Sequence, residues 1–120
     1  MTPPRTQRTA PLSRGTASAQ ARPLRLLVLE GPDRGQQVVV EEGTAMVGSQ
    51  PGCELVLTDP TVSRRHLSIE LRGERLRVRD LGSRNGTRYH GARLDGADLP
   101  YGAMLTVGKS VLGLLPTNSA

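Results

Sequence analysis

The sequence predicts an all-β domain folded as a sandwich of short strands. Apolar and polar residues alternate with a period of two in several runs, as half-buried strands require. Glycine, proline and Asp-Gly or Asn-Gly pairs separate these runs every few positions, and no segment keeps the spacing of an amphipathic helix. Many short strands between frequent turns are typical of sandwiches.

The expected strands follow one another closely along the chain. Leu24, Leu26 and Val28 lie at alternate positions and predict a first strand over 24–29. Further short strands are expected at 38–40, 45–47, 54–57, 104–107 and 111–115.

A hairpin is expected in the middle of the chain. Apolar residues occupy every second position over 67–72 and again over 75–79, with mostly charged residues between them. These runs predict two half-buried strands, each with one apolar and one charged face. The Gly73-Glu74 pair that joins them has the form of a two-residue turn with glycine first.

The core is expected to consist of aliphatic side chains. The 120 residues include no Phe, no Trp and only two tyrosines, Tyr89 and Tyr101. A fully buried aliphatic side chain contributes roughly 1.5–3 kcal/mol to stability. The length is enough for one domain and not for two.

The excess positive charge is confined to the N-terminal segment. The formal net charge is +5, yet from residue 26 onward 11 basic and 11 acidic side chains balance one another. Residues 1–22 hold Arg, Thr, Ser, Pro and Ala with a single Leu and no acidic residue, which predicts a disordered basic tail. The domain is expected over 23–116, and 117–120 is expected to be a tail or the start of a linker.

Composition also argues against several kinds of site. Cys53 is the only cysteine, so it has no internal disulfide partner, and it does not form a metal site with two distant histidines. We therefore expect no metal and no cofactor. The longest apolar run near the start, 26–29, is too short for a secretory signal or a membrane span. A soluble, cytoplasmic setting is expected.

Two loops gather hydroxyl, guanidinium and amide groups. The first, 61–66, precedes the strand that begins at Leu67, and the second, 82–87, follows the strand that ends at Asp80. Because the hairpin joins these strands at its far end, both loops are expected at the same edge of the sandwich. Such donors bind phosphate through charge-assisted hydrogen bonds.

At these loops the sequence resembles the forkhead-associated (FHA) domain family. The matching segments are Val47-Gly48, 60–66 (Pro-Thr-Val-Ser-Arg-Arg-His) and 80–87 (Asp-Leu-Gly-Ser-Arg-Asn-Gly-Thr), in the family's order and spacing. The resemblance covers about residues 24–115. It implies a sandwich of about eleven strands whose apical loops bind phosphothreonine in an extended peptide. The layout is also similar to domains at the N-termini of bacterial enhancer-binding transcription activators.

The resemblance implies a role for each matching residue. Ser63 would give its hydroxyl to the phosphate, and Arg64 would add a second contact from the same loop. Arg84 would contact the phosphate or the peptide backbone, which Asn85 would hold. The residues expected to shape the loops are Gly48, His66, Gly86 and Thr87. Among these, the histidine is expected to tie the two loops together.

Two positions depart from the family pattern. The family usually has a phosphate-clamping arginine after the glycine that matches Gly48, and this chain has Ser49 there. One charge-assisted contact, worth roughly 1.5–3 kcal/mol, is missing, although Ser49 stays within the candidate phosphopeptide site. The family usually has a loop-supporting asparagine before the glycine that matches Gly91, and this chain has His90. Only one tautomer of His90 can replace that asparagine, so loop order is expected to vary with pH.

The leading prediction is a phosphothreonine-peptide-binding signalling module within a larger regulator, which implies a Ser/Thr kinase and a phosphoprotein partner. A phosphate-independent interaction module on the same fold is the alternative that Ser49 favours. A hydrolase built on Ser63, His66 and Asp80 lacks the Gly-x-Ser-x-Gly elbow of such enzymes. Nucleic-acid binding is not expected for the domain, which is neutral and lacks stacking aromatics.

The tail adds a further candidate ligand. Thr6, Thr9 and Thr16 lie near arginines, as in kinase substrates. A phosphorylated tail would reach the two loops at a high effective concentration, so an intramolecular ligand is expected beside the external partner.

Overall fold

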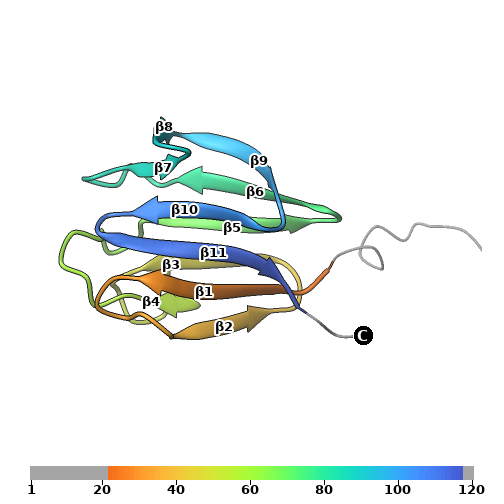
Figure 1. Cartoon of the computed structure of the whole chain (residues 1–120), viewed down its shortest axis with the longest axis horizontal. Coiled ribbons are helices and arrows are strands. Elements are labelled where there is room, and N and C mark those ends of the chain that lie inside the picture. The colour runs from red at the N-terminus through yellow and green to blue at the C-terminus, as the bar shows by residue number, and fades with distance from the viewer. Residues whose placement is uncertain (1–21, 118–120) are drawn as a thin grey trace, which may run out of the picture.

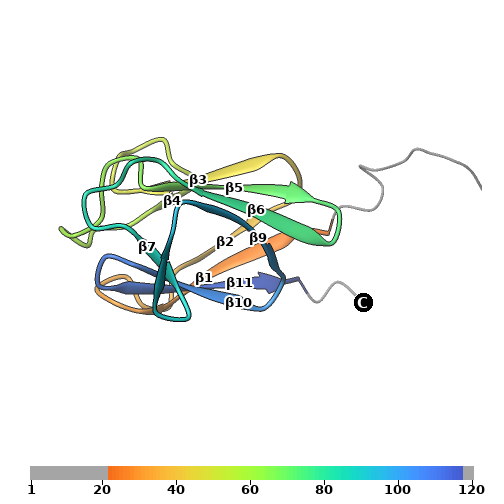
Figure 2. The same cartoon turned by 90° about the horizontal axis from the view of Figure 1, so that it is seen from above.

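The computed structural model describes residues 22–117, and these residues form eleven β-strands in two facing sheets (Figures 1 and 2). The six-stranded sheet has the order β2-β1-β11-β10-β7-β8, and the five-stranded sheet has the order β4-β3-β5-β6-β9. The predicted all-β sandwich of eleven strands is confirmed. Within the described range no helix is present that is long and apolar enough to cross a membrane.

The strands of the six-stranded sheet are β1 (Leu24–Glu30), β2 (Gln37–Val40), β7 (Thr87–Tyr89), β8 (Ala92–Leu94), β10 (Ala103–Val107) and β11 (Ser110–Pro116). Those of the five-stranded sheet are β3 (Thr44–Gly48), β4 (Leu55–Val56), β5 (Leu67–Arg72), β6 (Arg75–Asp80) and β9 (Gly96–Pro100). Only β3 and β4 pair in parallel; all the other pairs in these sheets are antiparallel. The tails predicted over 1–22 and 117–120 lie outside the described residues, apart from Arg22 and Thr117.

The β5–β6 hairpin forms as predicted. Leu67 pairs with Asp80 at one end and Arg72 with Arg75 at the other, around the two-residue turn. Gly73 has a φ of 66° and Glu74 does not share a positive φ, which is the pattern of a turn with glycine at its first central position. The hairpin therefore carries the 61–66 and 82–87 loops at the same end of the sandwich.

Three strands were not predicted from the periodicity. The strands β7, β8 and β9 are three to five residues long, and a period of two is hard to see over so few positions. The strand β9 also contains Gly96, Asp98 and Pro100, which are residue types depleted in strands. Together β7 and β8 widen the six-stranded sheet beyond β10, and β9 widens the other sheet beyond β6.

The core between the sheets consists of aliphatic side chains, as the composition predicts. Leucines and valines from β1, β11 and β10 pack against those of β5 and β6, and 20 hydrophobic residues form one buried cluster. The same alternation that buries one face of β5 and β6 leaves their other face charged. The core thus fixes the register of the hairpin, and the register fixes where its loops meet.

Candidate functional site

The two predicted loops contact one another directly. The backbone N–H of Arg84 donates to Ser63 Oγ over 2.9 Å, and Asn85 Nδ2 donates to the carbonyl oxygen of Thr61 over 2.8 Å. The structure therefore brings the first loop and the second loop together as one surface, which was the expectation from the hairpin.

A hollow of about 270 Å³ opens between these loops. Its lining residues are Ser49, Pro60, Thr61, Val62, Ser63, Arg64, Arg84 and Asn85. All five residues that the sequence predicted as ligand contacts lie in this lining, two of them are arginines, and none of the eight is acidic. The hollow is therefore positively charged and rich in hydrogen-bond donors, as an anion-binding site requires.

The hydrogen bonds of Ser63 and Asn85 leave specific groups free. Ser63 Oγ accepts from Arg84, so its own hydroxyl proton remains available to a ligand. Asn85 uses one amide hydrogen on Thr61, which leaves its second amide hydrogen and its carbonyl oxygen. Arg64 and Arg84 are exposed at the rim.

Ser49 lies beside the first loop because the backbone holds it there. Its N–H donates to the carbonyl oxygen of Ser63 over 3.0 Å, and the next residue, Gln50, bonds Arg64 in the same way over 3.1 Å. Gly48 precedes it, and a Cβ atom at this glycine would overlap the carbonyl group of Arg64. The loop-shaping role expected for Gly48 thus has a steric basis.

The second loop is organised by the buried carboxylate of Asp80. This carboxylate accepts hydrogen bonds from the N–H groups of Gly82 and Ser83 and from the hydroxyls of Ser83 and Thr87, over 2.7–3.0 Å. Burial opposes ionisation of Asp80, but the hydrogen bonds from Ser83 and Thr87 outweigh it and hold the pKa of this carboxyl below its usual value. The loop is therefore folded around a charged carboxylate.

The first loop is organised in the same way by Asp59. Its carboxylate accepts from the N–H and hydroxyl of Thr61, from the N–H of Lys109 and from the hydroxyl of Ser110. Burial again opposes ionisation, and these bonds lower the pKa of Asp59 below its usual value. This carboxylate fastens the loop to the β10–β11 turn, about fifty residues further along the chain.

His66 joins the two loops, as the resemblance implied. It is fully buried, its Nδ1 accepts the backbone N–H of Ser63 over 3.0 Å, and its Nε2 donates to the carbonyl oxygen of Gly86 over 2.9 Å. Gly86 has a φ of 81°, a conformation that favours glycine, and its N–H is held by Ser83 Oγ.

This bonding pattern also bears on the hydrolase alternative. Ser63 approaches the imidazole of His66 with its backbone N–H and not with its hydroxyl, which is bonded to Arg84. Both nitrogens of the ring are occupied by backbone groups, so the ring cannot take a proton from Ser63 Oγ. The three residues of the supposed triad serve to connect the loops.

His90 does not support the binding loops. It lies in the turn between β7 and β8, where His90 and Gly91 have φ values of 53° and 79°. Two consecutive positive φ angles are typical of the two-residue hairpin turn that prefers Asn-Gly. The asparagine that the family usually has at the position of His90 therefore suits the backbone conformation of this turn. The imidazole packs edge-on against Tyr89, with 4.2 Å between the ring centroids. The expectation that His90 controls the order of the binding loops is therefore wrong.

The family model described as "Inner membrane component of T3SS, cytoplasmic domain" matches residues 27–118. The glycogen accumulation regulator GarA of Mycolicibacterium smegmatis is 37% identical over 84 residues, which are 70% of this chain and 53% of GarA. The FHA domain of FhaA, solved in complex with the intracellular domain of Rv3910, is 30% identical with a TM-score of 0.67, over 74% of this chain and 96% of that one.

The chain belongs to the FHA domain family. A structure solved in a study of phosphothreonine-dependent FHA domain interactions superposes with a TM-score of 0.70 and 29% identity, over 78% of this chain and 95% of that chain. The chain spans about half the length of the curated relatives that it matches. The match to the family confirms the resemblance seen in the two loop motifs.

Sequence reasoning missed the two carboxylates of this site. The sequence predicts no role for Asp59, and it points to Asp80 only as a strand end, the first residue of the second motif and a member of the supposed triad. The signal for Asp80 is local, because Ser83 and Thr87 follow it within seven residues. No local pattern connects Asp59 with Ser110, so only the fold reveals that contact.

Proposed function

We propose that this FHA domain binds a phosphothreonine peptide in the hollow between its two loops. The observation that carries the proposal is the lining of the hollow, where two arginines, the free hydroxyl proton of Ser63 and the free amide groups of Asn85 converge without any acidic residue. A phosphothreonine carries a charge of roughly −1.5 to −2 near neutral pH and three strong acceptor oxygens. These are the acceptors that such donors need.

Each residue has a separate task in this proposal. Ser63 donates to one phosphate oxygen, and Arg64 and Arg84 neutralise the charge from either side. Asn85 bonds the main chain of the peptide next to the phosphothreonine, because its remaining donor and acceptor match a peptide group. Ser49 adds at most a neutral hydroxyl in place of the family's arginine.

The relatives support a role in signalling. One similar structure comes from work on phosphothreonine-dependent FHA interactions, and another holds an FHA domain in a complex with an intracellular domain. For this chain the proposal implies a Ser/Thr kinase that creates the ligand, and a cytoplasmic setting in which kinase and domain meet. We propose that the domain is the sensory or interaction part of a larger regulator, with a transcription activator of the enhancer-binding class as one such context.

The tail is the intramolecular ligand that we propose beside an external partner. Peptides that carry phosphothreonine at the position of Thr6, Thr9 or Thr16 are direct probes of this idea. Titration of residues 23–120 with each peptide should shift the backbone amide signals of the 61–66 and 82–87 loops in NMR spectra. Unchanged spectra with all three peptides would exclude the tail as a ligand.

A second candidate function is phosphate-independent protein interaction. Ser49 favours it, because the charge of the clamping arginine is absent. The match to a family named for a component of the type III secretion system also favours an assembly role. Under this alternative, Ser63→Ala and Arg64→Ala leave partner binding intact.

A phosphothreonine-oriented peptide library, screened beside the same library without phosphate, tests the proposal against this alternative. The wild-type domain should select phosphorylated peptides, Ser63→Ala should lose the selection, and Ser49→Arg should bind the selected peptides about ten- to a hundredfold more tightly, as one regained charge-assisted contact predicts. Selection of peptides without regard to phosphate by all three proteins would overturn the proposal.

A further inference from the structure

The outer face of the six-stranded sheet is unusually apolar. In an antiparallel sheet that packs on a core, the other face is normally polar. Here β1 and β11, which are neighbours in the middle of the sheet, carry apolar residues on both faces. We call the outward-facing set the apolar face; it consists of Leu27, Leu29, Val39, Met104, Val111 and Leu115.

The pairing register shows that these residues form one surface. Gly113 in β11 lies between Leu27 of β1 and Met104 of β10, so a strip free of charge crosses three strands. The side chains of Leu29 and Leu115 lie beside the same glycine. Met104 is 58% exposed and Val39 is 52% exposed, which are the two large hydrophobic side chains most open to solvent among the described residues.

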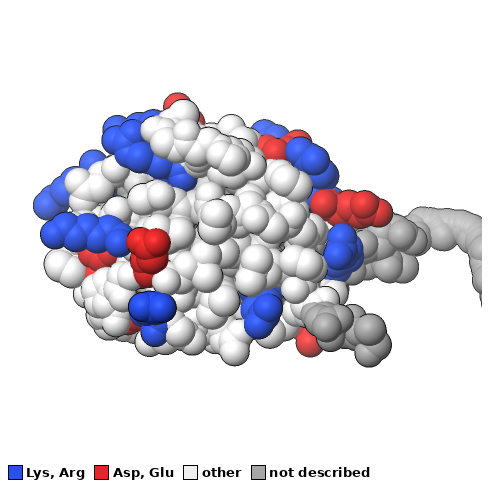
Figure 3. All heavy atoms as spheres, in the orientation of Figure 1, with Lys and Arg blue, Asp and Glu red and all other residues white. Residues whose placement is uncertain are grey.

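Charged side chains lie mainly around the margin of this face. Figure 3 shows the face toward the viewer, with a largely uncharged centre and basic and acidic residues mainly toward the rim. Two charged residues of β1 lie on this side. Arg25 is half-buried and donates to the side-chain oxygen of Gln37 over 3.3 Å, and Glu30 is exposed at the end of the strand, paired with Val111. The face thus offers a dry centre with a polar margin, which is the layout of a protein interface.

The opposite face of the sandwich is different. Its outward residues on β5 and β6 are Ser68, Glu70, Arg72, Arg75, Arg77 and Arg79. Arg77 pairs there with Asp98 of β9 over 3.0 Å. The same chain therefore makes one outer face charged and leaves the other apolar, so the apolar face is not explained by a general lack of polar residues.

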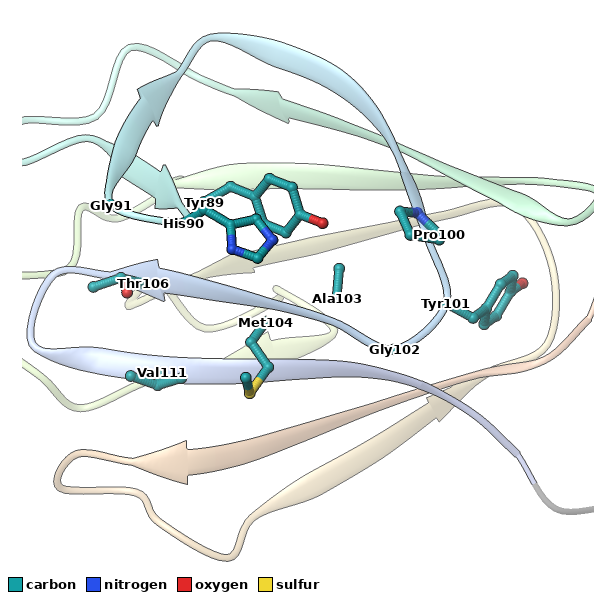
Figure 4. Close-up of a pocket in the computed structure, with 10 residues that line it drawn as sticks. All are labelled: Tyr89, His90, Gly91, Pro100, Tyr101, Gly102, Ala103, Met104, Thr106 and Val111. Atoms are coloured by element: carbon teal, nitrogen blue, oxygen red, sulfur yellow. The ribbon is translucent and has the colours of Figure 1, made fainter.

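A hollow lies at one edge of the apolar face (Figure 4). It has a volume of about 440 Å³, and the rings of Tyr89 and His90 form one wall while Met104 lies across from them. Tyr101 and Pro100 line its other end. The hollow and the exposed Val39 lie at opposite edges of the sheet, because β2 and β7–β8 are its two margins.

We propose that the apolar face binds the same face of a second copy of this chain. A two-fold axis parallel to the strands lays the β2 edge of one copy over the β7–β8 edge of the other, in the aligned packing that sheets commonly adopt. This arrangement places the exposed Val39 of each copy at the edge that carries the hollow beside Tyr89 and Met104. The β2 edge with Val39 thus faces the β7–β8 edge with the hollow, and the two-fold axis repeats this contact on the other side of the dimer.

The charge balance of the domain permits a second copy as the occupant. From residue 26 onward the chain carries 11 basic and 11 acidic side chains, so two copies of the domain have little net repulsion.

The size of the face sets the strength of the pairing. Six strands about 4.8 Å apart and up to seven residues long give a face of roughly 500 Å² per copy. The total of roughly 1,000 Å² is the lower limit for specific interfaces, so the dimer is weak and reversible. The peptide-binding loops lie at the end of the sandwich and outside the face, so dimerisation and peptide binding are measured independently.

Sedimentation equilibrium of residues 1–120 tests the proposal. With a reductant present to prevent cross-linking through Cys53, the average mass should rise from the 12.9 kDa of one chain toward twice that mass. The rise should occur between about 1 µM and 1 mM, the range expected for an interface of this size. A mass that stays at that of one chain throughout this range would overturn the proposal and leave the face to a different partner.

Charged substitutions locate the contact. Met104→Glu and Val39→Glu should each weaken association at least about tenfold, because both bury an unpaired charge in the interface. Both positions are more than half exposed, so the variants should fold, which circular dichroism checks. Thr44→Glu adds the same charge to the opposite face and should leave association unchanged. Equal weakening by Thr44→Glu, or no weakening by either apolar-face variant, would place the contact elsewhere.

Discussion

The loops at the end of this FHA domain contain two layers with different tasks. The inner layer, which we call the frame, has buried side chains whose polar groups are hydrogen-bonded within the loops and to the β10–β11 turn; its members are Asp59, His66, Asp80, Ser83 and Thr87. The outer layer, which we call the contact layer, is half-buried or exposed; its members are Ser63, Arg64, Arg84 and Asn85. The polar residues of the motifs are thus divided between holding the loops and meeting a ligand.

The difference between the frame and the contact layer shows how the backbone of a small site can be held rigid although its contact side chains are flexible. Arg64 and Arg84 are long side chains on loops, but their backbone positions are set by Ser63, His66 and Asp80 beneath them. Preorganised backbone lowers the entropy that a ligand would otherwise have to remove. A change in the frame should therefore affect both stability and binding, and a change in the contact layer should affect mainly binding.

The largest effect is expected for His66→Ala. This substitution leaves a cavity at a fully buried position and removes the bonds to Ser63 and Gly86. Urea unfolding should show a loss of about 2–4 kcal/mol in the free energy of unfolding, as expected for a buried hydrogen-bonded group, together with a loss of ligand binding. A stable variant that still binds phosphopeptide normally would show that the frame does not hold the loops.

The free energy of unfolding should fall by a smaller amount, about 1–3 kcal/mol, in Asp80→Asn. The amide of asparagine cannot accept all four of the hydrogen bonds that the carboxylate accepts. This variant also carries the pH prediction. Since the folded-state pKa of Asp80 is lowered, its contribution to stability is present above the unfolded-state pKa and is lost as the pH falls through the folded-state value.

The wild-type free energy of unfolding should therefore decline as the pH is lowered below about 5. The decline should be shallower in Asp80→Asn, where Asp59 alone of this pair still titrates with a lowered pKa. Unfolding curves recorded at several pH values compare the two proteins. Parallel declines would mean that Asp80 is not charged and bonded in the folded state.

Ser63→Ala tests the contact layer. It removes the proposed phosphate donor and should weaken phosphopeptide binding about 10- to 100-fold. The free energy of unfolding should change by at most about 1 kcal/mol, because only the hydrogen bond from Arg84 is lost. Ser68→Ala on the outer face of β5 is the matched control and should leave both quantities unchanged. A loss of stability as large as that of His66→Ala would show that Ser63 holds the loops together and belongs to the frame.

The smallest effect is expected for Asn85→Ala. Its amide is proposed to bond the peptide main chain through neutral hydrogen bonds, so affinity should fall about three- to tenfold. The loss should be similar for different phosphothreonine peptides, since a main-chain contact carries no side-chain preference. Fluorescence anisotropy with two unrelated phosphopeptides measures this, and a loss confined to one of them would assign Asn85 to side-chain recognition.

The sequence predicted the contact layer better than the frame. Ser63, Arg64, Arg84 and Asn85 lie in two continuous motifs, and the alternation over 67–79 was enough to place those motifs together. The bonds of Asp59 were not predictable, because they join residues fifty positions apart. The strands β7, β8 and β9 were not predictable, because β7 and β8 have only three residues each and β9 contains Gly96, Asp98 and Pro100, which are rare in strands.

His90 shows the opposite kind of error. A residue at a turn was interpreted through its side chain, whereas the structure assigns its importance to the backbone, which needs two positive φ angles at His90 and Gly91. The apolar face was also hidden in the sequence. The run of apolar residues in β11 predicts a strand, but only the register shows which of its side chains face away from the core.

The central claim is that the contact layer recognises phosphate, and isothermal titration calorimetry tests it most directly. One peptide selected from the phosphothreonine library is titrated into the wild-type domain in its phosphorylated and unphosphorylated forms. Phosphate recognition by two arginines and a hydroxyl predicts that the phosphorylated form binds at least about a hundredfold more tightly. Equal affinities for the two forms would contradict the account and favour an interaction module that does not read phosphate.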